Sequence, residues 1–362
     1  MSSEIVRNDG LPAHALAALG KDERTRGLIF DALREAELQA EDPAAFREQV
    51  RWPVILAMLT DVESHRVVLE NGVIFDVRPD SRIEKALLLS SVAHPDHVWE
   101  PQTTRLLTTL AADVTNVILG GAYIGDQAVL MAHAMTRGKL HAFEPMKHAF
   151  ERLLHHLQIN DLDNVVAHRL GLWSTSNASL QLDGHLALAS SIPLDDEQNA
   201  TGETTESISI DDYVRSHDLS RVELIMLDTE GGEENALLGA QQTIGRDQPN
   251  IVFEVHRNFV DWTDGLEKTS VVRFLTSQGY DVFAIRDFHN NYPMRAYPIE
   301  IVPVATVYLQ GPPHGFNLLA TRDDTLVERL DLRIVESVSP KLLLEKDPAL
   351  HFPKFTNDQE GA

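Results

Sequence analysis

Residues 115–126 constrain the fold of this chain more than any other segment. An apolar run at 117–119 predicts a buried parallel strand, and Gly120, Gly121 and Gly125 then form a tight turn. From Asp126 onward, apolar residues recur at helical spacing. A strand, a glycine turn and a helix in this order suit a nucleotide-like ligand, because a helix N-terminus presents unpaired N–H groups.

An acidic residue at the end of the next predicted strand strengthens this interpretation. Residues 139–143 are predicted to form that strand, which ends in Glu144 and Pro145. An acid about 20 residues after the glycines is the usual partner of a ribose diol. A glycine turn alone could equally serve packing, but the turn and Glu144 together predict a nucleoside site.

Predicted strands and helices alternate along most of the chain. Strands are expected at residues 117–119, 139–143, 165–170, 222–227, 251–255, 280–285 and 301–309, the last antiparallel to its neighbour. This alternation predicts an α/β fold with a doubly wound, mostly parallel sheet and helices on both faces. We expect a helical N-terminal region with a β-hairpin at 1–110, a ligand-binding domain at 111–322 and a C-terminal extension at 323–362.

The N-terminal region has its own signals. Residues 11–59 show helical periodicity, which Pro53 is expected to break or kink. Asn71-Gly72 between two β-branched runs predicts a hairpin. These helices could cap the main domain, form a homo-oligomer contact or close over a substrate.

Acidic residues follow two further predicted strands. Asp228, Glu230 and Glu233 come directly after the strand at 222–227, and Glu254 and His256 end the strand at 251–255. Ligands of a doubly wound sheet bind at the carboxyl ends of its strands, so we expect these side chains to converge beside the glycine turn. Separately, each could be an ordinary turn, helix-cap or loop residue.

Composition excludes several classes of protein. The chain has 362 residues, a net charge of −24 and no cysteine. Such acidity disfavours binding to nucleic acid or anionic lipid, and the lack of cysteine excludes disulfides and thiolate chemistry. We see no membrane-spanning run and no signal peptide at Met1-Ser2-Ser3-Glu4, so we expect a cytoplasmic protein without nucleic-acid or membrane partners.

Five ordered motifs resemble the FkbM-type methyltransferases. They are residues 121–125 (GAYIG), 142–145 (AFEP), Asn160 with 164–165 (NV), 227–233 (LDTEGGE) with 238–240 (LGA), and 249–254 (PNIVFE), while 98–101 (VWEP) resembles the approach to that domain. The likeness extends over about residues 100–317 with suitable gaps.

The resemblance implies a class I methyltransferase that uses S-adenosylmethionine (SAM), with a mostly parallel sheet of seven strands, the last antiparallel. Family members mostly methylate hydroxyl oxygens of sugars, polyketides, other secondary metabolites or glycolipids. The glycine turn would hold the amino-acid end of the cofactor, Glu144 the ribose, and residues after the third strand the adenine. The implied cofactor-binding residues are Gly120, Gly121, Ala122, Tyr123, Gly125, Glu144, Pro145, Gly171, Leu172, Trp173 and Asp228.

Two positions depart from the family pattern, which usually has an acid at Leu119 and an asparagine at Tyr123. We expect Leu119 to be packed among apolar residues and Glu100 to meet the cofactor ammonium instead. Tyr123 would narrow the pocket or replace the amide hydrogen bond with its hydroxyl.

Methyl transfer to a hydroxyl needs alignment and a base. We assign Asp228 and His256 as the catalytic residues, with Asp228 the first candidate base. Binding of a small-molecule hydroxylated acceptor is assigned to Glu230, Glu233, Glu254 and His256. We expect transfer to be metal-independent. The minor alternative is a divalent cation on Asp228, Glu230, Glu254 and His256.

Two other functions compete with a SAM-dependent O-methyltransferase. The glycine turn and Glu144 would also suit a nicotinamide-dependent oxidoreductase, although the full dinucleotide glycine pattern is absent. A non-catalytic binding protein on a decayed methyltransferase fold is the second alternative, and Leu119 is the residue that favours it.

Overall fold

A computed structural model describes residues 13–89, 98–183, 190–193, 202–287, 297–309 and 315–341. The chain divides into two compact units. The first comprises Met1–Val67 with Phe75–Leu88, and the second comprises Val68–Ile74 with Leu89–Ala362. The predicted strand at 301–309 lies within the described residues, whereas the predicted C-terminal extension at 323–362 lies within them only as far as residue 341.

The first unit is mainly helical. Its elements are α1 (Ala13–Gly20), α2 (Glu23–Leu38), α3 (Pro43–Phe46), the π-helical turn η1 (Arg47–Arg51), α4 (Trp52–Leu59) and α5 (Arg82–Leu88). Pro53 lies in the first turn of α4, directly after the π-helical turn η1, and the backbone stays helical between them. The proline therefore does not end the helical segment, but the regular α-helix is interrupted at the π-turn just before it. The buried Glu37 carboxylate pairs with Arg47 and Arg51 and so joins α2 to η1.

The predicted hairpin is confirmed. Strands β1 (His65–Val68) and β2 (Ile74–Val77) pair with each other, and Gly72 in their connection has a φ of +85°. Within the second unit, Asn160 binds the backbone N–H and carbonyl of Ile74 through both ends of its amide, each at 2.7 Å.

The second unit is built on one large mixed sheet. Within the described residues the sheet has nine strands in the order β15-β13-β12-β14-β11-β10-β3-β4-β5. Their bounds are β3 (Asn116–Gly120), β4 (Lys139–Phe143), β5 (Val165–His168), β10 (Leu224–Leu227), β11 (Asn250–Val255), β12 (Asp281–Ile285), β13 (Glu300–Pro303), β14 (Phe316–Thr321) and β15 (Arg333–Ile334). Strands β5, β4, β3, β10 and β11 are parallel, as the alternation predicted.

The far half of the sheet differs from the seven-strand expectation. The antiparallel strand β14 lies between β11 and β12, where the sequence analysis assigned no strand. The strand expected at 301–309 is shorter: β13 ends at Pro303 and the 3₁₀ turn η5 (Val304–Thr306) follows. Proline has no N–H for a ladder bond, which is one reason for a strand to end there.

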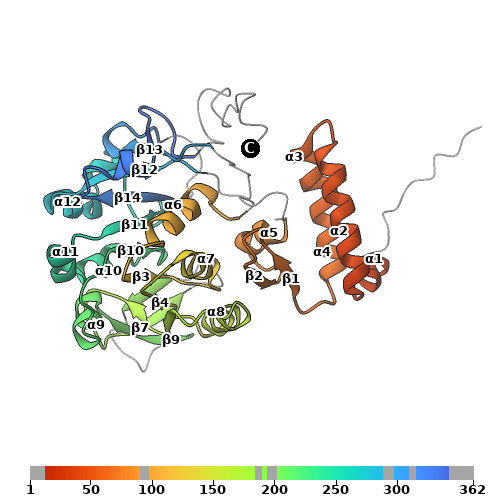
Figure 1. Cartoon of the computed structure of the whole chain (residues 1–362), viewed down its shortest axis with the longest axis horizontal. Coiled ribbons are helices and arrows are strands. Elements are labelled where there is room, and N and C mark those ends of the chain that lie inside the picture. The colour runs from red at the N-terminus through yellow and green to blue at the C-terminus, as the bar shows by residue number, and fades with distance from the viewer. Residues whose placement is uncertain are drawn as a thin grey trace, which may run out of the picture. The chain divides into compact units, whose positions relative to one another are not determined.

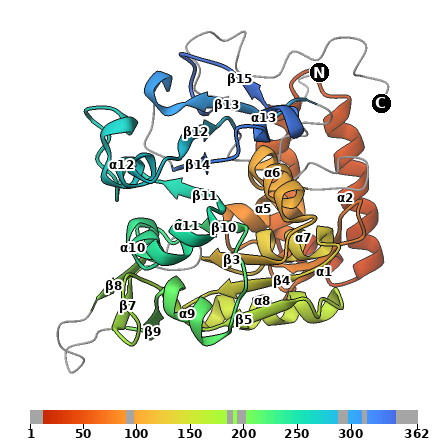
Figure 2. The same ribbon diagram turned by 60° about the vertical axis from the view of Figure 1, so that its left-hand side comes forward.

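Helices cover both faces of this sheet (Figures 1 and 2). One face carries α6 (Pro101–Ala111), α7 (Asp126–Ala134) and α8 (Lys147–Ile159). The other carries α9 (Ile210–Ser216), α10 (Glu233–Leu238), α11 (Gln241–Asp247) and α12 (Ser270–Ser277). The turn η4 (Leu266–Lys268) precedes α12, and α13 (Leu326–Arg329) follows β14. Fully buried Ile118, Ile225 and Phe253 belong to the apolar core of this unit.

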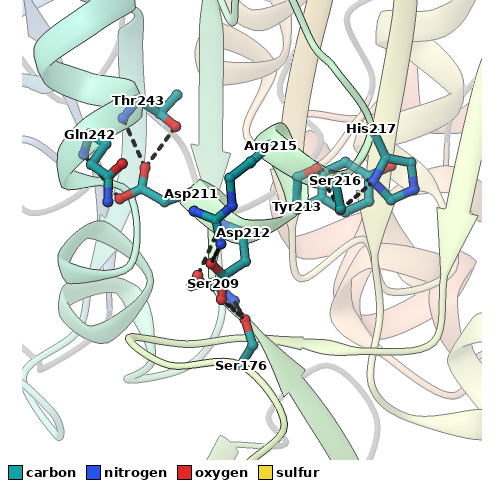
Figure 3. A network of polar contacts seen from close by, with 10 residues as sticks. All are labelled: Ser176, Ser209, Asp211, Asp212, Tyr213, Arg215, Ser216, His217, Gln242 and Thr243. Carbon is teal, nitrogen blue, oxygen red and sulfur yellow. Dashed lines mark hydrogen bonds and ion pairs between the residues drawn. The ribbon is translucent and has the colours of Figure 1, made fainter.

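A smaller sheet lies beside α9. Its strands are β6 (Gly171–Leu172), β7 (Ser179–Asp183), β8 (Ser190–Pro193) and β9 (Thr204–Ile208), in the order β6-β9-β7-β8. Ser209 caps α9 by accepting the N–H of Asp212 (Figure 3). The Asp211 carboxylate accepts the N–H groups of Gln242 and Thr243 at the start of α11. Asp211 therefore ties α9 to α11.

Among the described residues, no helix combines the length and the apolar character needed to cross a membrane.

Candidate functional site

The glycine turn begins where β3 ends. The N–H groups of Gly121 and Ala122 both donate to the Phe143 carbonyl at 3.0 Å, so the turn folds over the end of β4. Gly121 has a φ of +77°, and a Cβ there would lie 1.7 Å from the carbonyl oxygen of Asp228. Only glycine allows β3 and β10 to approach this closely beyond their last ladder bonds.

Glu144 closes the turn from the adjacent strand. One carboxylate oxygen accepts the N–H of Tyr123 at 2.7 Å, and the other accepts the N–H of Met146 at 2.8 Å. The side chain is 6% exposed, and burial raises the pKa of Glu144 to about 7 despite these two bonds. Each carboxylate oxygen can accept a further hydrogen bond, so Glu144 can fix the turn and still receive ribose hydroxyls.

The segment expected near the adenine lies beside the turn. Leu172 and Trp173 are buried. The Leu172 side chain lies 2.8 Å from the position of a Cβ built on Gly120, so the two residues are packed together. The ring of Trp173 packs against Gly232, because a Cβ built on that glycine would lie 3.4 Å from Trp173 Cζ3. Gly171 and Leu172 form β6 of the small sheet rather than a continuation of β5.

Leu119 is 1% exposed and packed in the middle of the sheet. Glu100 lies immediately before α6 and is 5% exposed, and Asn317 Nδ2 donates to its carboxylate at 2.6 Å. Burial and the charge of Asp287 raise the pKa of Glu100 to about 8. Whether Glu100 meets a cofactor ammonium stays a prediction.

The loop after β10 carries the acidic motif. Glu233 accepts the N–H and hydroxyl of Thr229 at 2.6 and 3.0 Å and the N–H of Gly231 at 3.0 Å, so its carboxylate holds the loop closed. Asp228 and Glu230 remain partly accessible. Glu100, Tyr123 and Glu230 have φ values of 47°, 45° and 50°, a left-handed conformation that costs energy and tends to occur at functional sites.

Asp228, Glu230 and Glu254 converge as the strand order predicted. One carboxylate oxygen from each lies within 4.8 Å of the other two. Burial and then the charge of Glu230 raise the pKa of Asp228 well above its ordinary range, and burial and then Asp228 do the same for Glu254. Burial also raises the pKa of Glu230, to about 7, and that of Glu233. The site therefore favours a cation or bound protons.

His256 follows β11 at the same edge of the sheet. Its Nδ1 accepts the N–H of Asn258 at 3.1 Å, and its ring lies 5.5 Å from that of Phe259. A neutral histidine whose Nδ1 accepts a hydrogen bond carries its proton on Nε2. In this arrangement the lone pair that could take a substrate proton is already engaged, which favours Asp228 over His256 as the base.

A cavity of about 560 Å³ is lined in part by Arg257, the residue after His256. Phe259, Asp261 and Trp262 also line it. Phe259 connects this cavity to the acidic loop, because its ring packs directly on Gly231. A second cavity of about 450 Å³ lies at Glu223 and Asn250, near the opposite ends of β10 and β11, away from the carboxylates.

Sequence reasoning missed three contributors to this site. Asn317 lies on the unpredicted strand β14, Asp126 adds negative charge from the first turn of α7, and Phe259 lies in an irregular loop. The sequence signal for Asn317 was its position as a polar residue within the apolar run 316–320. A run this short does not show by its periodicity whether it forms a strand or a loop.

The site therefore has a glycine turn after β3 and an acid at the end of β4 that is hydrogen-bonded to that turn. Residues 120–282 match the family model described as the methyltransferase FkbM domain. This part of the chain belongs to that methyltransferase family, as its motifs indicated. No curated protein matches the chain.

Three solved structures are similar to this chain at low sequence identity. A methyltransferase FkbM from Methylobacillus flagellatus KT is 13% identical over 66% of this chain and 52% of its own, with a TM-score of 0.36. TYW2 of P. horikoshii, solved in complex with MeSAdo, is 14% identical over 76% and 85%, with a TM-score of 0.37. A precorrin-6y C5,15-methyltransferase from Geobacter metallireducens GS-15 is 14% identical over 61% and 87%, with a TM-score of 0.35. Such low scores support no conclusion, so the family assignment stands on the domain match.

Proposed function

We propose that this chain is a SAM-dependent O-methyltransferase acting on a hydroxyl of a small cytoplasmic metabolite, such as a sugar or polyketide. The observation that carries the proposal is the hydrogen bond from Tyr123 N–H to Glu144. This bond fixes Glu144, the residue proposed to bind the ribose hydroxyls, to the glycine turn within a methyltransferase domain. The nearby carboxylates suit a cofactor that carries two positive charges, on its sulfonium and its ammonium.

In the proposed reaction the acceptor oxygen attacks the methyl carbon in line with the sulfur. The O–CH₃ bond forms while the S–CH₃ bond breaks, so the sulfonium becomes the neutral thioether of S-adenosylhomocysteine (SAH). The hydroxyl proton passes to Asp228, whose raised pKa makes its carboxylate a stronger base than an exposed aspartate. Positioning the reactants can supply on the order of 7 kcal/mol of the acceleration.

The cavity beyond His256 is the proposed acceptor site. Its aromatic walls, Phe259 and Trp262, suit the apolar face of a sugar or polyketide ring, and Arg257 and Asp261 offer polar contacts. Because Phe259 packs on Gly231, an acceptor held there would lie next to the acidic loop.

Transfer of labelled methyl from SAM to a panel of hydroxylated acceptors tests this function. We expect product with at least one acceptor, and a loss of about 100-fold or more in Asp228→Asn. Asp323→Asn is the matched control, because Asp323 lies outside the site and binds the backbone of Thr325. A chain that binds SAH but transfers no methyl to any acceptor would favour the non-catalytic alternative.

A further inference from the structure

The acidic cluster of Asp228, Glu230 and Glu254 extends along a row of the sheet. Leu227 pairs with Phe253, so Asp228 and Glu254 are neighbours one position further along these parallel strands. Glu254 in turn pairs with Asn317 on the antiparallel strand β14. Directly opposed residues project from the same face of a sheet, so Asn317 shares a face with Glu254.

The Asn317 amide is held in one orientation. Its Nδ2 donates to Glu100 at 2.6 Å, which leaves Oδ1 as the free end of the amide. The reverse orientation would set the amide oxygen against the Glu100 carboxylate, oxygen against oxygen. Asn317 is 3% exposed, and its Oδ1 has no hydrogen-bond partner anywhere in the described ranges. A buried acceptor without a partner costs about 1–3 kcal/mol, so an unpaired amide oxygen on the residue directly opposite Glu254 indicates a missing cation or donor.

We propose that Asp228, Glu230, Glu254 and Asn317 bind one divalent cation of the Mg²⁺ or Ca²⁺ type. Three carboxylates and an amide oxygen are the hard oxygen ligands that these ions prefer, and water can complete the coordination. The partial exposure of the three carboxylates leaves the cation open to an exogenous ligand. His256, the fourth residue of the sequence-based alternative, is outside this set, and Asn317 takes its place.

The cation site would deepen the proposed function, and its catalytic meaning rests on that function. An acceptor hydroxyl bound to the cation would have a lowered pKa and would be held beside the aromatic cavity. A cation on Asp228 would offset the neighbouring negative charges that raise the pKa of this carboxyl. In this version of the mechanism the cation activates the hydroxyl, and the second oxygen of Asp228 accepts the proton that is released. Cation binding itself requires no methyl transfer and can be measured alone.

Electron paramagnetic resonance of Mn²⁺ titrated into chelator-treated protein tests the site, with SAH calorimetry on the same samples. We expect one saturable Mn²⁺ per chain, displaced by Mg²⁺ or Ca²⁺. Asn317→Ala and Glu254→Gln should each weaken Mn²⁺ binding roughly 10-fold or more. Asn317→Asp, which keeps a ligand oxygen, should retain binding even if the alanine variant fails to fold.

Asn164→Ala is the matched control. Asn164 also has a buried Oδ1 without a partner among the described residues and an Nδ2 bonded to a carbonyl, at 2.8 Å, but it precedes β5 at the opposite edge of the sheet. Its variant should bind Mn²⁺ normally. Folded wild-type protein that binds SAH but no Mn²⁺ would overturn the cation site while leaving the proposed function intact. Mn²⁺ binding by Asn317→Ala and Glu254→Gln that equals binding by the wild-type protein would mean an adventitious ion only. Stoichiometric displacement of Mn²⁺ by SAH would assign the carboxylates to the cofactor ammonium.

Discussion

Substituting Gly121 by alanine should disturb the fold and the site together. The new Cβ would lie 1.7 Å from the Asp228 carbonyl oxygen, whereas real Cβ atoms keep at least 3.0 Å from such a neighbour, so the two must separate by at least the difference of 1.3 Å. Overpacking of this kind costs about 1–3 kcal/mol. The left-handed backbone costs a residue with a Cβ a further 1–2 kcal/mol, roughly. We therefore expect Gly121→Ala to lower the free energy of unfolding by about 2–5 kcal/mol.

Gly279→Ala isolates the close approach from the backbone strain. Gly279 has a φ of +82°, but the nearest atom to a Cβ there is 3.6 Å away, an ordinary contact. Urea unfolding should show a loss of about 1–2 kcal/mol for this variant. Displacement of Asp228 by more than 1 Å should also lower turnover by about 100-fold in Gly121→Ala but not in Gly279→Ala. Equal destabilisation of the two variants, or full turnover in Gly121→Ala, would refute the reasoning.

Three further outcomes are expected. Glu144→Ala should weaken SAH binding by about 1–3 kcal/mol in calorimetry, since it removes a charged acceptor, and an unchanged dissociation constant would place the ribose elsewhere. Asp228→Asn should lower turnover far more than His256→Ala, and the reverse order would make the histidine the base. Burial raises the pKa values of Glu144, Glu230 and Glu100 to about 7, 7 and 8 in the folded state. These carboxyls are protonated more readily in the folded than in the unfolded chain, so their protonation stabilises the fold. This stabilisation is complete below pH 4.5, their ordinary pKa, and is lost as pH rises through their folded-state pKa values of about 7 to 8. The melting temperature in chelator should therefore fall between pH 5.5 and 8.5, and a rise over that window would contradict these shifts.

The parallel half of the sheet could be predicted because its determinants are local. Strands β3, β4 and β10 are largely apolar runs followed by glycine or an acid, and the carboxyl ends of parallel strands must meet at one edge. That rule predicts that Asp228 and Glu254 lie close together, as they do. Glu144 could be found in the same way, because it ends the strand next to the glycine turn.

The antiparallel half could not be predicted because it depends on long-range pairing. Strand β14 inserts between β11 and β12, and no local pattern specifies that order. Asn317 was missed for this reason. The use of Glu233 as a loop clamp and of Asp211 as a cap for α11 likewise depends on which N–H groups lie nearby in space.

Calorimetric titration of the wild-type chain with SAH and with NADH, side by side, tests the nucleoside site most directly. We expect SAH to bind with one site per chain, and NADH not to bind, because the glycine turn and Glu144 belong to a methyltransferase domain. Binding of NADH without SAH would contradict the proposed function and favour the oxidoreductase alternative.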